Sequence, residues 1–450
     1  MTRQAVLACL LITFICPTLL GGQDAKSPGP RHITLEEAVK LALQHNHIVR
    51  IAGYKVEEKE HSKEVARSAY FPTVRNDSGV ARLTETQFIG IPAGSLGIVA
   101  GTPIPEQTAV LNQGGLTLIT SGTQLTQPLT ELWKVKSANN VAAAEVSVAR
   151  SKRQQTENEV ALKVHQLYYR TLVLQTHKEA VGAKIQASDD LQSERVQQVR
   201  YGSKLAEEEI ESRAESLEAR QDLLTTDLQL SDLNMQLDDA LGLPLTTQLA
   251  LDPGVREVTD TCEREECLRV AMESHPEIAE ARAEIEKASA ATTLAKRQYV
   301  PDVEAFARYS YQDDVPFLAR NFGTFGVHFG YDLFDGGRRN AEIGERKAQL
   351  AQAEQNLARV KEEVELRVQT AYNKMERTRQ MMKVSEEILS LRMESHRVSV
   401  EQFKQGAMLR SQMDTAAAHE LDAKTLLMQS QLDYIQARDE LIESVGQTPE

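Results

Sequence analysis

Hydrophobic residues in the C-terminal part of the chain recur at every seventh position, which is the spacing of a coiled-coil seam. The repeat runs through Ile343, Leu350, Leu357, Val364 and Ala371. Proline, which helix interiors exclude most strongly, is missing from two long stretches, 129–243 and 317–448. We therefore predict long helices at 131–200, 204–242, 335–403 and 407–445, preceded by shorter helices at 33–69 and 263–298.

A single glycine interrupts each pair of long helices, at Gly202 and at Gly406. A lone glycine inside a helix costs only ~1 kcal/mol relative to alanine, but its recurrence at the same place in both pairs favours two hairpin tips. The first helix of each hairpin has 70 or 69 residues, and the short helix plus the second helix has 37 + 39 = 76 or 36 + 39 = 75. Stacking of these shorter helices end to end predicts a wall of uniform length, with the mature N-terminus, the linker and the C-terminus at mid-height.

The hydrophobic period changes to two between each short helix and the next long one. Apolar and small or polar residues alternate along 303–312 and 324–333, and less cleanly along 72–84 and 115–128, with Ile89–Gln113 as a Gly- and Pro-rich loop. Nine of the 21 Phe and Tyr residues fall within 301–334. This pattern is typical of transmembrane β-barrel strands; the alternative is a soluble hairpin that lies on a helical bundle.

The two halves of the chain repeat one another. Glu36–Val74 aligns with Glu265–Val303 at an offset of 229, and Pro128–Gly242 aligns with Asp332–Gly446 at an offset of 204. A repeat of this length indicates a duplicated half-protein rather than a solenoid. The expected organisation is a signal peptide (1–23), a first repeat (24–242), an equatorial linker (243–262), a second repeat (263–446) and a tail (447–450).

Composition and charge narrow the function. Aromatic residues make up 5% of the 450 residues, which suits long, thinly packed helices, and the net charge of −14 with no basic cluster argues against nucleic-acid binding. The apolar run 5–20 after Arg3 resembles a secretory signal, being shorter than the roughly 20 residues of a membrane span. A membrane anchor and a lipid-attached cysteine are the alternatives.

Enzyme chemistry finds little support in the sequence. The close pair His45 and His47 would diverge on a helix, and the abundant carboxylates follow the polar faces of helices. Cys262 and Cys267 form no convincing zinc motif; they could close a short disulfide loop or serve as small core residues. We expect no catalytic residue, no metal and no cofactor.

Four strands cannot close a barrel, and an open sheet edge is not tolerated in lipid. Three copies would supply 12 strands and 12 continuing helices. The predicted fold is therefore mainly α with membrane β: a long α-helical coiled-coil barrel continuous with a trimeric, 12-stranded β-barrel, with four strands per chain.

The mature sequence resembles the TolC-type outer-membrane efflux proteins. The residues that carry the resemblance are the helix starts Leu35–Ala38, Cys267–Ala271 and His275–Ile278, the turns Tyr70–Pro72 and Tyr299–Pro301, and the turn Asp332–Gly337. The first half departs from the pattern, reading Glu131-Leu132-Trp133 where the second has Gly336-Gly337.

The resemblance implies a homotrimer in the outer membrane with a helical tunnel in the periplasm. A periplasmic adaptor and an inner-membrane pump or ABC transporter would be its partners, and the chain would be the passive exit duct of a tripartite efflux or type I secretion system. The alternative is a secreted coiled-coil adaptor or scaffold without a pore.

Two sites follow from the resemblance. Adaptor docking is expected at the hairpin tips: Gly202, Ser203, Lys204, Leu205, Gly406, Ala407, Met408 and Leu409. A lumen gate of acidic residues is expected just past the tips: Glu208, Glu211 and Asp414. The alternatives are that the tip residues only cap and plug the closed end, and that the acids are ordinary solvated helix residues.

Overall fold

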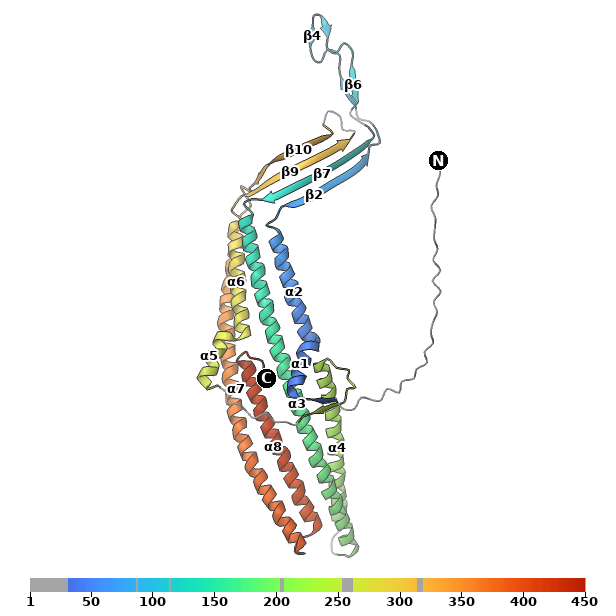
Figure 1. Cartoon of the computed structure of the whole chain (residues 1–450), viewed down its shortest axis with the longest axis vertical. Helices are drawn as coiled ribbons and strands as arrows, with labels where there is room; N and C mark the ends of the chain where they lie inside the picture. The colour runs from blue at the N-terminus through green and yellow to red at the C-terminus, as the bar shows by residue number, and fades with distance from the viewer. Residues whose placement is uncertain are drawn as a thin grey trace, which may run out of the picture.

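The computed structural model describes residues 31–85, 88–112, 115–202, 206–252, 262–313 and 319–449. The predicted signal peptide and residues 253–261 of the linker lie outside these ranges. The described chain is elongated: a β-sheet lies at one end and two helical hairpin tips lie at the other (Figure 1).

Four long helices confirm the prediction from the heptad pattern. They are α3 (Leu132–Arg200), α4 (Ala206–Leu241), α7 (Arg338–Lys404) and α8 (Arg410–Ser444). Gly202 and Gly406 take left-handed conformations with φ of 70° and 72°, which glycine adopts without a steric penalty. Helix α3 starts at Leu132 even though the first half lacks the glycine pair.

The two short helices are each broken, so the predicted continuous helices 33–69 and 263–298 were wrong. The structure has α1 (Leu35–His45), α2 (His47–Ser68), α5 (Arg264–Ser274) and α6 (Pro276–Arg297). The residue at each break, Asn46 or His275, is extended at φ −61° and ψ 130°, and its side chain accepts a hydrogen bond from the backbone two residues on. The extended residue ends one helix and caps the next.

The helices stack as their lengths predict. Helix α3 packs against α2 and α6 in one half of its length and against α4 and α8 in the other, and the C-terminus lies at mid-height (Figure 1). Two hydrophobic cores occupy this middle zone, one around Val164 and Leu237 and one around Val364 and Leu441. The same zone holds an unpredicted parallel pair of short strands, β1 (Arg31–Ile33) and β8 (Leu249–Leu251).

The four predicted strands form one antiparallel sheet. Its members are β2 (Thr73–Arg82), β7 (Thr117–Pro128), β9 (Asp302–Asp313) and β10 (Asn321–Gly330), in the order β10-β9-β7-β2. The first hairpin thus lies beside the second through the β7–β9 pair. The edges of the sheet are β2 and β10.

The segment Ile89–Gln113, predicted as a loop, contains short strands within its described part. Strand β3 (Phe88–Ile91) pairs with β6 (Ala109–Asn112), and β4 (Ile98–Val99) pairs with β5 (Thr102–Pro103). The glycines and prolines that favoured a loop lie mainly between these short strands. Their ribbon projects beyond the sheet, away from the helices (Figure 1).

Cys262 and Cys267 form a disulfide, which is one of the two interpretations that the sequence left open. The bridge links Cys262, two residues before α5, to Cys267 in the first turn of that helix. Cys267 is also fully buried in the second hydrophobic core, so it fills the position that Ala38 fills in the first repeat.

Candidate functional site

One face of the sheet is apolar and exposed along the second hairpin. Phe325 is 88% exposed, and Val327 and Phe329 beside it are also uncovered. Tyr309 of β9 and Val74 of the edge strand β2 continue this face. Exposed aromatic and branched side chains on one sheet face indicate a surface that lipid or another chain covers.

The apolar face has a polar patch in the middle of the first hairpin. Ser78 Oγ lies 2.8 Å from Ser121 Oγ and donates to Asn76 Oδ1 at 2.7 Å, and Asn76 Nδ2 donates to Thr123 Oγ1 at 2.8 Å. The four side chains form hydrogen bonds with one another, which lowers the free-energy cost of removing their polar atoms from water.

The opposite face is polar and hollowed. A hollow of about 600 Å³ lies on it, lined among others by Asp77, Thr120, Arg308, Gln312 and Thr324. Since the inside of a curved sheet is its concave face, this is the side that faces inward when such a sheet closes into a barrel.

Aromatic residues gather where the sheet meets the helices. The Arg339 guanidinium lies 5.2 Å from the ring centre of Tyr299 and 5.0 Å from that of Tyr331, and its Nε donates to Asp335 at 2.6 Å. Trp133 and Phe334 are exposed at the same junction. Such aromatic girdles mark the interfaces of membrane barrels.

The lateral edges of the chain carry uncovered heptads. On α4, Ile210, Leu217 and Leu224 are spaced by seven residues and are 70%, 58% and 71% exposed. On α7, the residues Val384, Leu391 and Val398 have the same spacing and are also exposed. Helices α4 and α7 lie at opposite sides of the helical layer (Figure 1). A coiled-coil seam on each side therefore has no partner among the described residues.

The hairpin tips have apolar, exposed residues. Leu409 is 51% exposed and Ala407 is exposed, while Met408 is half-buried. The backbone N–H of Leu409 donates to Gln412 Oε1 at 3.3 Å, which caps α8. Ser203, Lys204 and Leu205 of the first tip lie outside the described residues.

The three predicted gate acids have different surroundings. Glu208 forms an ion pair with Arg195 across the first hairpin, and Glu211 is exposed. Asp414 packs against α3, close to Asp190. Glu208 and Glu211 thus lie on α4, whereas Asp414 lies on α8.

Asp190 and Asp414 share one cation. Arg410 Nε lies 3.7 Å from Asp190 Oδ2 and 3.5 Å from Asp414 Oδ2. Burial, and then the neighbouring Asp190 carboxyl, raise the pKa of Asp414 above its ordinary value, and Arg410 partly opposes this. The sequence shows the i, i+4 spacing of Arg410 and Asp414, but the contact of both with Asp190 on another helix was not foreseen.

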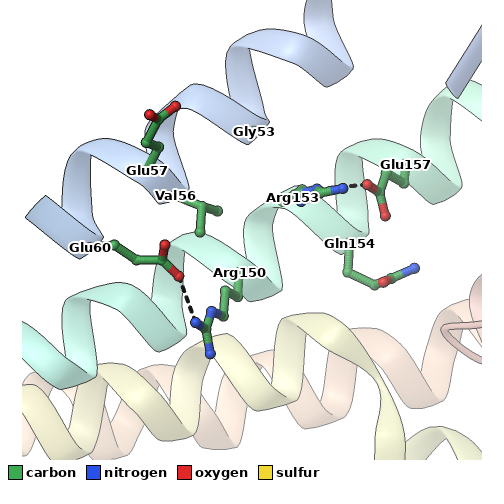
Figure 2. A pocket seen from close by; sticks show the side chains of 8 residues that line it. All are labelled: Gly53, Val56, Glu57, Glu60, Arg150, Arg153, Gln154 and Glu157. Carbon is green, nitrogen blue, oxygen red and sulfur yellow. Dashed lines mark hydrogen bonds and ion pairs between the residues drawn. The ribbon is translucent and has the colours of Figure 1, made fainter. Parts of the chain in front are cut away.

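The described hollows do not resemble catalytic sites. Figure 2 shows one of about 590 Å³ between α2 and α3, where Glu60 pairs with Arg150 and Arg153 pairs with Glu157. These are balanced surface charges without a nucleophile beside a base. The described ranges contain no group of three His, Cys, Asp or Glu that could hold a metal ion.

No helix along the described chain combines the length and the apolar composition of a membrane span.

Comparisons with known proteins agree with this geometry. Residues 267–447 match the family model described as outer membrane efflux protein. A search of curated proteins finds no match. Among solved structures, the Campylobacter jejuni CmeC outer membrane channel is 12% identical, with a TM-score of 0.74 over 92% of this chain and 85% of that chain. VceC from Vibrio cholerae is 15% identical, with a TM-score of 0.70 over 92% and 97%.

The open-state MtrE outer membrane channel of Neisseria gonorrhoeae is 14% identical, with a TM-score of 0.71 over 92% of this chain and 89% of that chain. These identities establish a shared fold, that of an outer-membrane channel subunit. The family match over residues 267–447 agrees with this fold and with the sequence resemblance.

Proposed function

We propose that three copies of this chain form the complete exit duct. The observation that carries the proposal is that four edge elements have no partner among the described residues: β2 and β10 end the sheet, and the heptads of α4 and α7 are uncovered. Joining β2 of one copy to β10 of the next leaves no free edge, which lipid requires. Three copies give 12 strands, enough for a small barrel, with the polar face inside.

The same contact pairs the helical edges. The exposed heptad of α4 around Leu217 in one copy lies against the exposed heptad of α7 around Leu391 in the next copy. Each apolar stripe is then buried, and the helices close into a tunnel. The repeats 24–242 and 263–446, joined by the linker 243–262, each supply one sixth of a pseudo-six-fold wall.

The closed end of this tunnel is the pair of hairpin tips. Arg410 ties Asp190 of α3 to Asp414 of α8, so it holds the two hairpins of one copy together beside the tips. Glu208 and Glu211, repeated three times around the axis, make the opening acidic and attract cations. Release of the Arg410 contacts lets the hairpins move apart.

The tips are also the docking surface for a periplasmic adaptor, which connects the duct to an inner-membrane pump or ABC transporter. Leu409 and Ala407 are exposed at the far end of the helical arm, where a partner's apolar surface would cover them. Conduction is passive, so the pump sets the substrate.

Insertion of the purified protein into planar lipid bilayers tests the proposal. Discrete conductance steps that are larger when Arg410 is replaced by Gln support a tunnel held shut at the tips. A wild-type protein that inserts without conducting, while Arg410→Gln is equally silent, would contradict it.

A further inference from the structure

A row of polar residues with two arginines crosses the concave face of the sheet. Arg308 of β9 lies opposite Gln124 of β7, and Gln124 lies opposite Arg75 of β2. Directly opposite residues of an antiparallel pair project to the same face. One chain therefore places two guanidinium groups at one level of the polar face.

The two arginines differ in their partners. Arg75 Nε donates to Asp77 Oδ1 at 2.9 Å, so its charge is balanced. The Arg308 side chain forms no ion pair or hydrogen bond with any described residue, although a guanidinium has five N–H donors. Among these residues, it is an uncompensated positive charge on the inner face.

Gly122 allows Arg308 to lie flat against β7. A Cβ at position 122 would lie 2.8 Å from Arg308 Nη2 and 3.0 Å from Nε, which is closer than real contacts allow. The missing side chain leaves room for the guanidinium against the strand, while its N–H groups face the hollow of about 600 Å³.

The rest of the hollow suits an anion. Thr120, Ser310 and Thr324 line it with hydroxyl groups, and its carboxylate, Asp77, is already paired with Arg75. The next acid on this face toward the helices is Glu304, four residues along β9, which is about 13 Å at the usual strand rise. The level of Arg308 is thus locally basic in a chain whose net charge is −14.

We propose that Arg308 makes the barrel lumen an anion-binding constriction, where three guanidinium groups bind the carboxylate or phosphate groups of solutes in transit. The inference rests on the proposed trimer, which places one Arg308 per copy at a common level. Guanidinium recognises these groups by paired, charge-assisted hydrogen bonds, and rings of arginine favour anions in pores. The duct then has two filters of opposite sign: acids at the tips and arginines near the exit.

This proposal is tested by adding inorganic tripolyphosphate to the side of the bilayer opposite the helical tunnel and measuring the block of single-channel current. The wild-type channel is blocked, and Arg308→Gln raises the half-blocking concentration at least about fivefold, the factor for losing one water-screened contact between unit charges. Arg308→Gln also shifts the reversal potential in a KCl gradient toward cations. The control is Arg82→Gln, because Arg82 lies on the apolar face of the same sheet.

A second variant keeps the test decisive if Arg308→Gln does not insert. Gln124→Glu puts a carboxylate directly opposite Arg308 without changing side-chain size, and it should weaken the block as Arg308→Gln does. Equal block of the wild type and of either conducting variant overturns the inference and leaves the channel intact. If the wild type does not conduct, the block is measured in the Arg410→Gln background, and absence of conductance in both overturns the proposed duct and the inference with it.

Discussion

Gly446 lies so close to His275 that a Cβ on the glycine would come within 2.8 Å of the His275 Cα. The first repeat has the same joint, where a Cβ on Gly242 would lie 3.0 Å from the His45 carbonyl oxygen. Both glycines are left-handed, with φ of 91° and 68°. Gly242 follows α4 and lies against the break between α1 and α2, and Gly446 follows α8 and lies against the break between α5 and α6. The end-to-end stacking of these helices therefore requires glycine at both positions.

Substitution Gly446→Ala should destabilise this joint. The left-handed backbone costs about 1 kcal/mol with a Cβ, and overpacking adds about 1–3 kcal/mol. We expect a lower thermal midpoint of the detergent-solubilised protein, followed by far-ultraviolet circular dichroism. The control is Gly344→Ala, since Gly344 faces open space within α7 and alanine there should stabilise the helix by up to ~1 kcal/mol. An unchanged or higher midpoint for Gly446→Ala would contradict the account of the joint.

The sequence predicted the long elements well because their signals are repetitive. The heptads gave four helices within a few residues, and the glycines 202 and 406 marked both tips. The breaks at Asn46 and His275 were missed because helical periodicity continues on both sides of a single extended residue. Pro276 was a local signal for one of them, because a residue before proline avoids the helical region.

The gate contacts could not be predicted in the same way. Arg410 and Asp414 are one helical turn apart, but Asp190 is on a helix of the other repeat, and only the packing of α3 against α8 brings them together. Likewise, the alternation of β9 predicted which residues share a face, whereas the register that aligns Arg308 with Gln124 depends on pairing between hairpins.

Asp414→Asn should stabilise the closed tip at pH values above 3.8, the ordinary pKa of an aspartate side chain. The folded protein holds this proton more tightly than the unfolded chain, so the closed state loses stability as pH rises through the raised pKa, and it regains that stability as pH falls. The neutral amide removes repulsion with Asp190 and should contribute about 0.5 kcal/mol. The open probability of single channels should fall at neutral pH and depend less on pH.

The exposed Asp422 on the same helix offers a matched control. Asp422→Asn should leave both the open probability and its pH dependence at wild-type values. If Asp414→Asn opens the channel more often than the wild type does, the attraction between Asp414 and Arg410 outweighs the repulsion between Asp414 and Asp190, and this prediction is wrong.

Leu217→Glu with Leu224→Glu should prevent assembly. Both leucines are exposed in the single chain, so the change costs little before association, but it would bury two charges in the proposed seam at several kcal/mol. Size-exclusion chromatography with light scattering should show smaller species. Glu218→Gln, at an exposed position beside them, should assemble normally. Full assembly of the double variant would exclude α4 from the interface.

Leu205→Glu with Leu409→Glu should abolish docking without affecting assembly. A charge at the exposed tip opposes burial against an apolar partner surface. Cross-linking of the variant to its periplasmic adaptor in cells should disappear, and export should stop, while membrane insertion continues. Cross-linking at the wild-type level in a correctly assembled protein would show that the tips only close the tunnel.

The central claim is that three copies close one duct, because β2, β10 and the heptads of α4 and α7 have no partner within the described chain. Native mass spectrometry of the protein released from a mild detergent measures this most directly. The account predicts a dominant species with the mass of three mature chains. A stable monomer or dimer as the dominant species, under conditions that preserve the helical circular-dichroism signal, would contradict it.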